Sequence, residues 1–240
     1  MTAPVFRLDP LPDDDLLVLT GDEARHAATV RRLRTGERVD LTDGRGGVVE
    51  GVVEAATRDR LEVRVEVRRR ESAPSPRLVV VQALVKGERS ELAVELLTEL
   101  GVDEVVPWEA ERSVARWAGE KSARRWSAAA ESAAKQSRRA HWPVVGEVAR
   151  RDDVVARLRA ADVGVVLTET ATVPLSALAL SDQLREIVVV VGPEGGINDR
   201  ELTAFAEAGA EPHLLGPTVL RASTAGAAAA AVLLARVGRW

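Results

Sequence analysis

The sequence predicts an α/β protein with a mostly parallel sheet in its C-terminal part and a small β-barrel in its N-terminal part. Three observations support this. Short β-like runs fill residues 1–70, and after residue 77 continuous apolar runs alternate with helical patterns. The segment between them, residues 71–76, is rich in Pro and Ser and is the best domain boundary in the chain. Two Gly-containing signatures, at 190–197 and 214–225, each begin where an apolar run ends.

Period-two patterns justify the N-terminal strands. Half-buried strands are expected at residues 16–19, 38–42, 47–53 and 60–67. The last run alternates most clearly, with leucine and valines on one face and charged residues on the other. Residues 43–47 are a hairpin signal, because Asp-Gly and Gly-Gly pairs favour tight turns. Residues 22–34 are expected to form a short helix between the first two strands.

The second half alternates strands and helices. A continuous apolar run, typical of a buried parallel strand, covers residues 78–85, and further strands are expected at residues 102–107, 163–168, 187–191 and 212–215. Helical spacing predicts helices at residues 90–100, 119–139 and 223–237. Gly101 is expected to end the first of these, and Asn198 to cap a further helix. Such alternation places strand ends at one carboxyl edge, where α/β proteins bind ligands.

Composition excludes several kinds of site. The 240 residues include no Cys and only three scattered His, so we expect neither disulfides nor a metal site. No apolar run reaches the ~18 residues of a membrane span. The N-terminus lacks the basic start and apolar centre of a signal peptide. We therefore expect a cytoplasmic protein with no membrane partner.

Charge is unevenly distributed along the chain. The net formal charge is −4, yet residues 112–151 carry ten basic and three acidic side chains, an excess of +7. Trp117, Trp126 and Trp142 lie in this stretch, and Trp108 just before it. Basic side chains neutralise phosphates and aromatic rings stack on bases, so the segment is a candidate RNA-binding surface. The alternative is a solvated helix face with tryptophans in the core.

The Gly-Pro-Glu-Gly-Gly sequence at 192–196 is neither a P-loop nor a dinucleotide-binding turn. It can still present backbone groups to a flat, polar ligand, because Gly195 and Gly196 permit an approach that a Cβ would block. The alternative is a tight strand-to-helix turn without a ligand.

The two signatures in this order resemble the SPOUT class of RNA methyltransferases, and within it the chain is similar to the RsmE family. The shared motifs cover nearly the whole chain. They lie at residues 26–32, Gly36, Lys86, 98–101, 112–114, 135–139, 192–196 and 215–225. The chain departs from the family pattern at Arg31 (usually Leu), Lys135 (usually acidic), Val219 (usually Ile) and Ser223 (usually Glu).

The resemblance implies a PUA-like β-barrel RNA-binding domain at 1–72 and a SPOUT methyltransferase domain with a C-terminal trefoil knot at 77–240. It implies methylation of nitrogen 3 of a uridine in the decoding region of 16S ribosomal RNA, in the small ribosomal subunit, with S-adenosylmethionine as cofactor. It also implies a homodimer through the C-terminal domain. The alanine-rich helix at 223–237 agrees with this, since it is too apolar to face water on every side. The alternative is burial of that helix within its own domain.

The resemblance also assigns site residues. Three strand ends are expected to hold the cofactor through Leu167, Thr168, Glu169, Gly192, Pro193, Gly195, Gly196, Leu215, Gly216 and Leu220. Arg221 is a catalytic candidate that can stabilise a developing uracil oxyanion, and the alternative is an ion pair or phosphate contact. Glu194 is a second candidate, which either orients the base or caps a loop. The RNA-binding candidates are Arg25, His26, Arg31, Arg32, Arg112, Gln136, Arg138 and Arg139.

Two other classes of function stay open on the residues alone. A binding module with the same two parts would bind RNA or ribosomes without affinity for S-adenosylmethionine. A small-molecule enzyme would use the crevice for a nucleotide, independently of the basic segment. The sequence identifies no general base.

Overall fold

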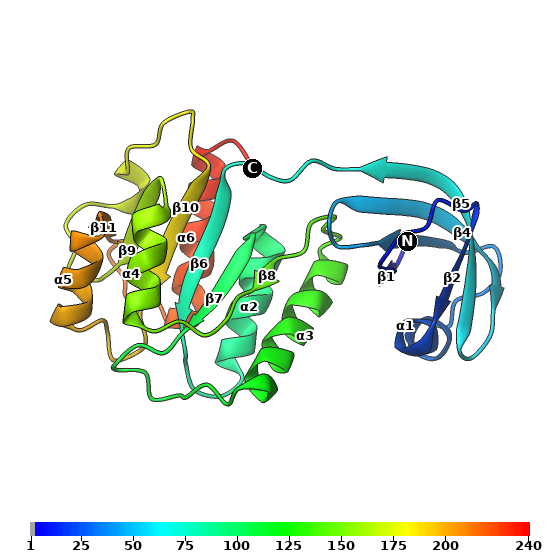
Figure 1. The fold of residues 1–240 in the computed structure, drawn as a ribbon, viewed down its shortest axis with the longest axis horizontal. Coiled ribbons are helices and arrows are strands. Elements are labelled where there is room, and N and C mark those ends of the chain that lie inside the picture. The colour runs from blue at the N-terminus through cyan, green and yellow to red at the C-terminus, as the bar shows by residue number, and fades with distance from the viewer. Residues whose placement is uncertain (1–2) are drawn as a thin grey trace. The chain divides into compact units, whose positions relative to one another are not determined.

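The computed structural model describes residues 3–240, which divide into two compact units (Figure 1). The first contains the described residues up to Ala73 together with Lys135–Trp142, and the second contains Pro74–Ala134 and Pro143–Trp240. The change at Ala73–Pro74 lies in the Pro/Ser-rich segment. The predicted division at 1–72 and 77–240 assigns Lys135–Trp142 to the C-terminal domain, whereas the contacts of this segment place it in the first unit.

A curled five-stranded sheet forms the first unit, with strand order β1-β3-β4-β5-β2. Its strands are β1 (Val5–Arg7), β2 (Leu16–Thr20), β3 (Arg38–Thr42), β4 (Gly47–Ala56) and β5 (Arg60–Arg70). β1 and β3 are parallel and the other pairs antiparallel. Leu61 and Val63 of β5 are buried in the core as the alternation predicts, but Val67 on the same face is 49% exposed.

The helix expected at 22–34 is shorter than predicted. α1 (Gly21–Arg25) continues directly into a π-helical turn, η1 (His26–Val30). The Thr29 hydroxyl donates to the Arg25 carbonyl at 2.6 Å, a side-chain bond of the kind that competes with regular helix. β-branched residues at 29 and 30 also have low helix propensity. Arg32, with φ of 53°, turns the chain away.

The Lys135–Trp142 segment is anchored inside the first unit by polar and aromatic contacts. The Lys135 ammonium lies 2.5 Å from a carboxylate oxygen of Glu23, on α1. The Arg7 guanidinium carbon lies 5.4 Å from the ring centroid of Trp142, a cation–π distance. Contacts between residues so far apart in sequence explain why the Pro/Ser-rich segment alone does not mark the division of the chain.

The second unit is built on a six-stranded sheet of order β11-β9-β10-β6-β7-β8, in which all the described pairs are parallel. The strands are β6 (Arg77–Ala83), β7 (Glu104–Trp108), β8 (Val144–Val145), β9 (Val163–Leu167), β10 (Glu186–Val191) and β11 (Ala210–His213). The predicted α/β class, with a parallel C-terminal sheet and an N-terminal β unit, is confirmed. The trefoil knot stays a prediction.

Helices cover both faces of this sheet (Figure 1). They are α2 (Arg89–Leu100), α3 (Glu120–Gln136), α4 (Arg151–Ala160), α5 (Asp199–Glu207) and α6 (Ala222–Arg236), with a 3-10 turn, η2 (Leu175–Ala177). Leu78 and Val80 of β6 pack with α2, α3 and α6, while Val79 and Val81 pack with α4 and α5. Burial on both faces is why the strands read as continuous apolar runs.

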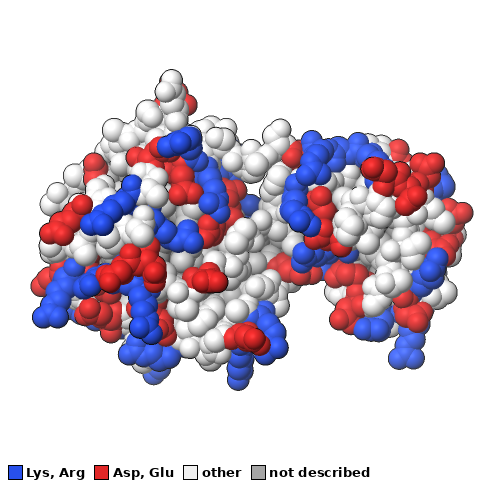
Figure 2. Space-filling model, viewed as in Figure 1, with Lys and Arg blue, Asp and Glu red and all other residues white. Residues whose placement is uncertain are grey.

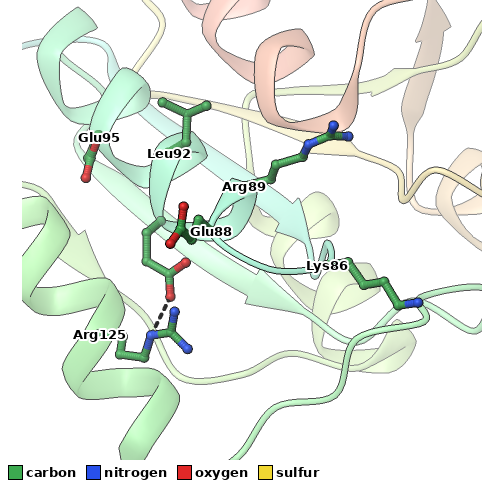
Figure 3. A pocket seen from close by; sticks show the side chains of 7 residues that line it. Lys86, Glu88, Arg89, Leu92, Glu95 and Arg125 are labelled. Atoms are coloured by element: carbon green, nitrogen blue, oxygen red, sulfur yellow. Dashed lines mark ion pairs between the residues drawn. The ribbon is translucent and has the colours of Figure 1, made fainter.

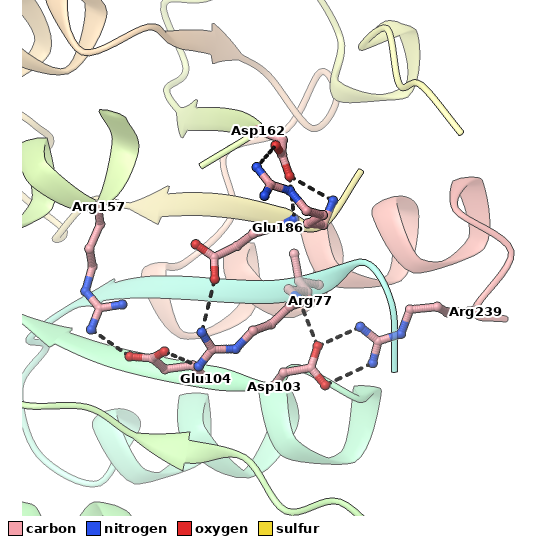
Figure 4. Close-up of polar contacts among 9 residues, drawn as sticks. Arg77, Asp103, Glu104, Arg157, Asp162, Glu186 and Arg239 are labelled. Carbon is pink, nitrogen blue, oxygen red and sulfur yellow. Dashed lines mark hydrogen bonds and ion pairs between the residues drawn. The ribbon is translucent and has the colours of Figure 1, made fainter. Parts of the chain in front are cut away.

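Ion pairs join the amino ends of the strands (Figure 4). The nearly buried Glu104 carboxylate contacts Arg77 at 2.5 Å and Arg157 at 2.7 Å, and Arg77 also reaches Glu186 at 3.0 Å. Asp103 and Arg239 pair at 2.6 Å. These charges are mutually compensated, so this edge has a structural role, and the opposite, carboxyl edge is the candidate for function.

One face of α6 is buried within its own unit. Gly226 makes the close packing possible, because an added Cβ would lie 3.3 Å from side-chain atoms of Leu97 on α2 and Val191 on β10. Leu233 and Leu234 are also buried there. The half-buried residues form the remaining apolar stripe, namely Ala225, Ala228, Ala231 and Val232. The homodimer therefore stays a proposal that depends on this stripe.

Candidate functional site

Three strand ends meet at the carboxyl edge of the parallel sheet. Val191 of β10 and His213 of β11 both pair with Leu167 of β9, so the loops that follow begin at the same level. The sequence suggests that the loops at 192–196 and 215–220 lie side by side, but β9 and the loop that follows it lie between them. The reason is the crossover through α5, which carries the chain from β10 past β9 to β11.

The loop at 192–196 is a tight turn that requires glycine. The Gly196 amide donates to the Pro193 carbonyl at 2.9 Å, and Gly196 has a φ of 72°, which favours glycine. A Cβ added at Gly192 would lie 2.7 Å from Cγ1 of Ile197. Glu194 is exposed at the turn.

Arg112 packs directly on this loop. Its Nη1 donates to the Gly195 carbonyl at 3.2 Å, and a Cβ added at Gly195 would lie 3.2 Å from the Arg112 Cβ. Arg112 follows β7, which β6 separates from β10. The structure therefore brings this predicted RNA-binding residue to the predicted cofactor loop.

The loop after β9 is held by short local bonds. The Thr168 amide donates to the His213 carbonyl at 3.1 Å, and the hydroxyl oxygens of Thr168 and Thr170 are 2.9 Å apart. Leu167 is half-buried and Glu169 exposed. Backbone bonds thus join the ends of β9 and β11.

The loop at 215–220 has unused backbone groups. Leu214 is anchored, because it donates to the Val173 carbonyl at 3.0 Å and accepts from the Leu175 amide at 2.8 Å. Within residues 3–240, no backbone hydrogen bond involves residues 215–220. A Cβ added at Gly216 would meet no atom within 4 Å. Backbone donors and acceptors along this open loop, which includes Leu215 and Leu220, are available to a ligand.

Arg221 occupies the N-cap position of α6, makes no side-chain capping bond and is exposed. Among the described residues its guanidinium has no ion-pair partner, so the ion-pair alternative has no support in the structure. Behind it the buried Gln82 amide donates to the Ala222 carbonyl at 3.3 Å. Sequence reasoning missed Gln82, although it is the one polar residue in the apolar run at 78–85.

The other RNA-binding candidates lie in the first unit. Arg25 pairs with Asp22, and the His26 ring lies edge-on to Phe6 at 5.9 Å. Arg31 and Arg32 are exposed, and neither has an ion-pair partner in the part of the chain that the structure describes. The remaining candidates in this unit are Gln136, Arg138 and Arg139.

Arg138 has intramolecular partners. Its guanidinium lies 3.8 Å from the Asp40 carboxylate and donates to the Ala3 carbonyl. Burial raises the pKa of Asp40 above its ordinary value, and the Arg138 charge opposes that rise. The Arg139 carbonyl accepts from the Trp142 indole at 3.0 Å. These residues therefore stabilise the first unit, whatever their contacts with RNA.

The burial of the tryptophans and the distribution of surface charge both bear on the candidate RNA-binding surface at 112–151. Trp108 and Trp126 are buried in the second unit, so they cannot stack on bases, and the core interpretation is correct for them. Figure 2 shows basic and acidic side chains interspersed on the viewed face of each unit. Local basic clusters, rather than a field of one sign, are the candidate phosphate contacts.

Two cavities lie apart from the three loops. One, of about 670 Å³, is at the start of α2, where Glu91 pairs with Arg125 of α3 at 2.8 Å (Figure 3). Lys86 and Arg89 point away from the carboxylates in that view. The second, of about 490 Å³, is lined by residues that include Glu111, Arg150 and Glu201. Neither cavity is lined by residues 192–196 or 215–221.

No group of three or more His, Asp or Glu among residues 3–240 is placed to hold a metal ion. No helix in the same residues is long and apolar enough to cross a membrane.

Two family models match the chain. The RNA methyltransferase domain matches residues 71–234, and the RNA methyltransferase PUA domain matches residues 19–66. Ribosomal RNA small subunit methyltransferase E of Mycobacterium tuberculosis is 48% identical over 250 residues, covering 100% of this chain and 94% of that protein. The Bacillus subtilis protein of the same name is 27% identical and covers 86% and 85%.

Solved structures are similar over almost the full length. The ribosomal RNA small subunit methyltransferase E of Neisseria gonorrhoeae, bound to S-adenosyl methionine, has a TM-score of 0.86 at 26% identity, with 98% of each chain covered. A Legionella pneumophila protein in complex with the same cofactor has a TM-score of 0.88 at 26% identity, again with 98% of each chain covered.

Proposed function

Because the chain belongs to the ribosomal RNA small subunit methyltransferase E family, we propose that it methylates nitrogen 3 of a uridine in the decoding region of 16S ribosomal RNA, with S-adenosylmethionine as methyl donor. A ribosomal substrate implies action in the cytoplasm. The observation that carries the proposal is the juxtaposition, at one sheet edge, of a glycine turn and an open loop with unused backbone groups.

The residues at this edge fit the cofactor. An adenine ring is flat and has polar edges, so free backbone N–H and C=O groups at 215–220 suit it. Leu215 and Leu220 add apolar surface, and Gly216 leaves the space beside it open. The tight glycine turn at 192–196 brings its backbone close, and Thr168 and Glu169 supply polar groups at the end of β9. The bound cofactor supplies a methyl group on a sulfonium centre.

Arg221 and Glu194 act on the base in this proposal. Nitrogen 3 of uridine carries a proton at neutral pH and faces its pairing partner in a duplex, so the base must be unpaired before it reacts. Removal of that proton develops negative charge on the uracil oxygens. The exposed Arg221 guanidinium, with no acidic partner among the described residues, stabilises that charge. Glu194 orients the base.

RNA binding is assigned to the first unit together with Arg112. Arg31 and Arg32 are exposed cations, and neither charge is neutralised by a described partner. The basic residues near the C-terminus of α3 lie in the same unit as this pair. These clusters of basic residues are small and can neutralise few phosphates. The preferred substrate is therefore an assembled small subunit rather than free 16S RNA.

The active form is a homodimer through the C-terminal domain, paired along the half-buried stripe of α6. Light scattering at micromolar concentration is expected to report about twice the 25.7 kDa chain mass. A monomer that methylates at full rate would contradict this part of the proposal.

Calorimetric titration with S-adenosylmethionine, followed by transfer of a labelled methyl group to small subunits, tests the function. Binding with transfer is expected. RNA binding without cofactor affinity would instead favour the non-enzymatic binding module, and cofactor turnover without RNA would favour a small-molecule enzyme.

A further inference from the structure

Glu201 is a buried carboxylate beside the cofactor loop. It is the third residue of α5, and its side chain is 0% exposed. Burying a charge is unfavourable unless hydrogen bonds or an opposite charge compensate it. No basic side chain pairs with Glu201 among residues 3–240. Backbone amides must therefore stabilise the carboxylate.

One oxygen of Glu201 performs an ordinary capping task. The Asn198 side-chain oxygen accepts from the Glu201 amide at 2.9 Å, and Oε2 of Glu201 accepts from the Asn198 amide at 3.2 Å. This reciprocal arrangement is a capping box, and it needs one carboxylate oxygen only. Capping alone leaves the second oxygen unexplained.

The second oxygen binds another loop. Oε1 of Glu201 accepts from the Glu111 amide at 2.9 Å, across 90 residues of sequence. The Asn198 side-chain amide donates to the Glu111 carboxylate at 2.7 Å, so both members of the cap hold the same residue. Glu111 directly precedes Arg112, whose guanidinium donates to the Gly195 carbonyl at 3.2 Å.

These bonds join the loops that follow β7 and β10 across the end of β6, the strand between them. We infer that Glu201 is a positioning residue. Through the Glu111 amide it holds Arg112 against the Gly195 carbonyl, and so fixes the conformation of residues 192–196. Its effect on the cofactor rests on the proposed function, whereas its effect on the loop does not.

Glu201→Gln is the selective test. The side-chain oxygen can keep the bond to the Asn198 amide, but the NH₂ group then faces the Glu111 N–H, donor against donor. We expect the KM for S-adenosylmethionine to rise about tenfold, the equivalent of one buried unsatisfied donor, and kcat to change less than about twofold. Glu207→Gln, on the exposed side of the same helix, is the matched control and is expected to leave both unchanged.

A double-mutant cycle shows whether Glu201 acts through Arg112. We expect Arg112→Ala to raise the KM in the wild-type protein and to have little further effect in the Glu201→Gln protein, since both changes remove the same contact. Asn198→Ser is a milder variant that keeps a good N-cap but loses the donation to Glu111. It is expected to shift the KM in the same direction by a smaller factor.

Amide hydrogen exchange without cofactor separates this inference from the proposed function. Exchange at 192–197 is expected to be faster in Glu201→Gln and unchanged in Glu207→Gln. If the wild type fails to bind S-adenosylmethionine, the function is wrong, and the exchange result still decides the role of Glu201. Unchanged exchange, or an unchanged KM with additive effects of Glu201→Gln and Arg112→Ala, would show that Glu201 is only a helix cap.

Discussion

Gln82 and Ala222 are 140 residues apart in sequence, yet the buried side-chain amide of Gln82 donates to the Ala222 carbonyl at 3.3 Å. Gln82 lies on β6, in register with Val191, the last residue of β10. Ala222 is the first residue of α6 and follows Arg221. A side chain on a central strand is therefore bonded to the point at which the loop at 215–220 becomes a helix.

Gln82→Leu is expected to weaken S-adenosylmethionine binding by about two- to tenfold, the equivalent of one hydrogen bond, because the start of α6 loses a donor. Stability is expected to change little, since the Gln82 Oε1 has no hydrogen-bond partner and its replacement by an apolar group removes an unfavourable burial. Calorimetric titration and thermal unfolding measure the two quantities.

Thr98→Val is the control for this substitution. The Thr98 hydroxyl is buried in α2 and donates to the Val94 carbonyl at 2.7 Å. Its loss is expected to leave cofactor affinity unchanged. Equal losses of affinity in the two variants would show that Gln82 has no special relation to the site.

Gly196→Val is expected to raise the dissociation constant for S-adenosylmethionine by about tenfold or more. The φ of 72° is unfavourable for a β-branched residue by about 1–3 kcal/mol, so the turn rearranges. Gly209→Val, with a φ of 89° in the turn before β11, introduces the same strain at the amino edge. It is expected to lower stability only. Wild-type affinity in Gly196→Val would remove the loop at 192–196 from the cofactor site.

The periodicity of apolar residues and the positions of Gly and Pro predicted most of the strands. They also predicted two of the three loops that meet at the carboxyl edge. Helix α4 was missed because it is mostly charged, and strands β1 and β8 were missed because three and two residues are too few for a periodic signal. Strand order was also missed, because nothing local in the sequence records that β9 lies between β10 and β11.

The contacts that complete the site depend on tertiary structure. From the sequence, Arg112 is a basic residue in a basic segment, which indicates RNA binding. Its contact with Gly195 arises only because the loops after β7 and β10 converge. Glu201 has the sequence pattern of a helix cap, which accounts for one of its oxygens. The bond to Glu111 could not be predicted, because it connects two loops that are far apart in the chain.

Arg31→Glu is expected to weaken binding to small subunits and to reduce the slope of log affinity against log salt by about 0.7 for one lost single-strand phosphate contact. The control is Arg159→Glu, an equal charge change on an exposed residue of α4, outside the proposed interface. Filter binding over a series of salt concentrations measures both. Identical slopes for the two variants would indicate that Arg31 makes no phosphate contact.

Asp40→Asn is expected to change how the stability of the first unit depends on pH. Burial raises the pKa of Asp40 above 3.8 in the folded state. Between pH 3.8 and the raised pKa, the native protein therefore binds more protons than the unfolded chain. The wild type therefore loses stability relative to Asp40→Asn as pH rises from 3.8 through the raised pKa, and the difference is constant above it. Urea unfolding of both proteins from pH 3 to 7 measures the difference, and a wild type that gains stability relative to Asp40→Asn over this range would contradict the burial of the charge.

The central claim is methylation of uridine nitrogen 3 in 16S ribosomal RNA, and nucleoside mass spectrometry of that RNA tests it most directly. In a strain without this protein, we predict that one 3-methyluridine is missing from the decoding region. Expression of the wild-type protein restores it, and expression of Gly196→Val does not. A 3-methyluridine content that is unchanged by loss of the protein would contradict the account.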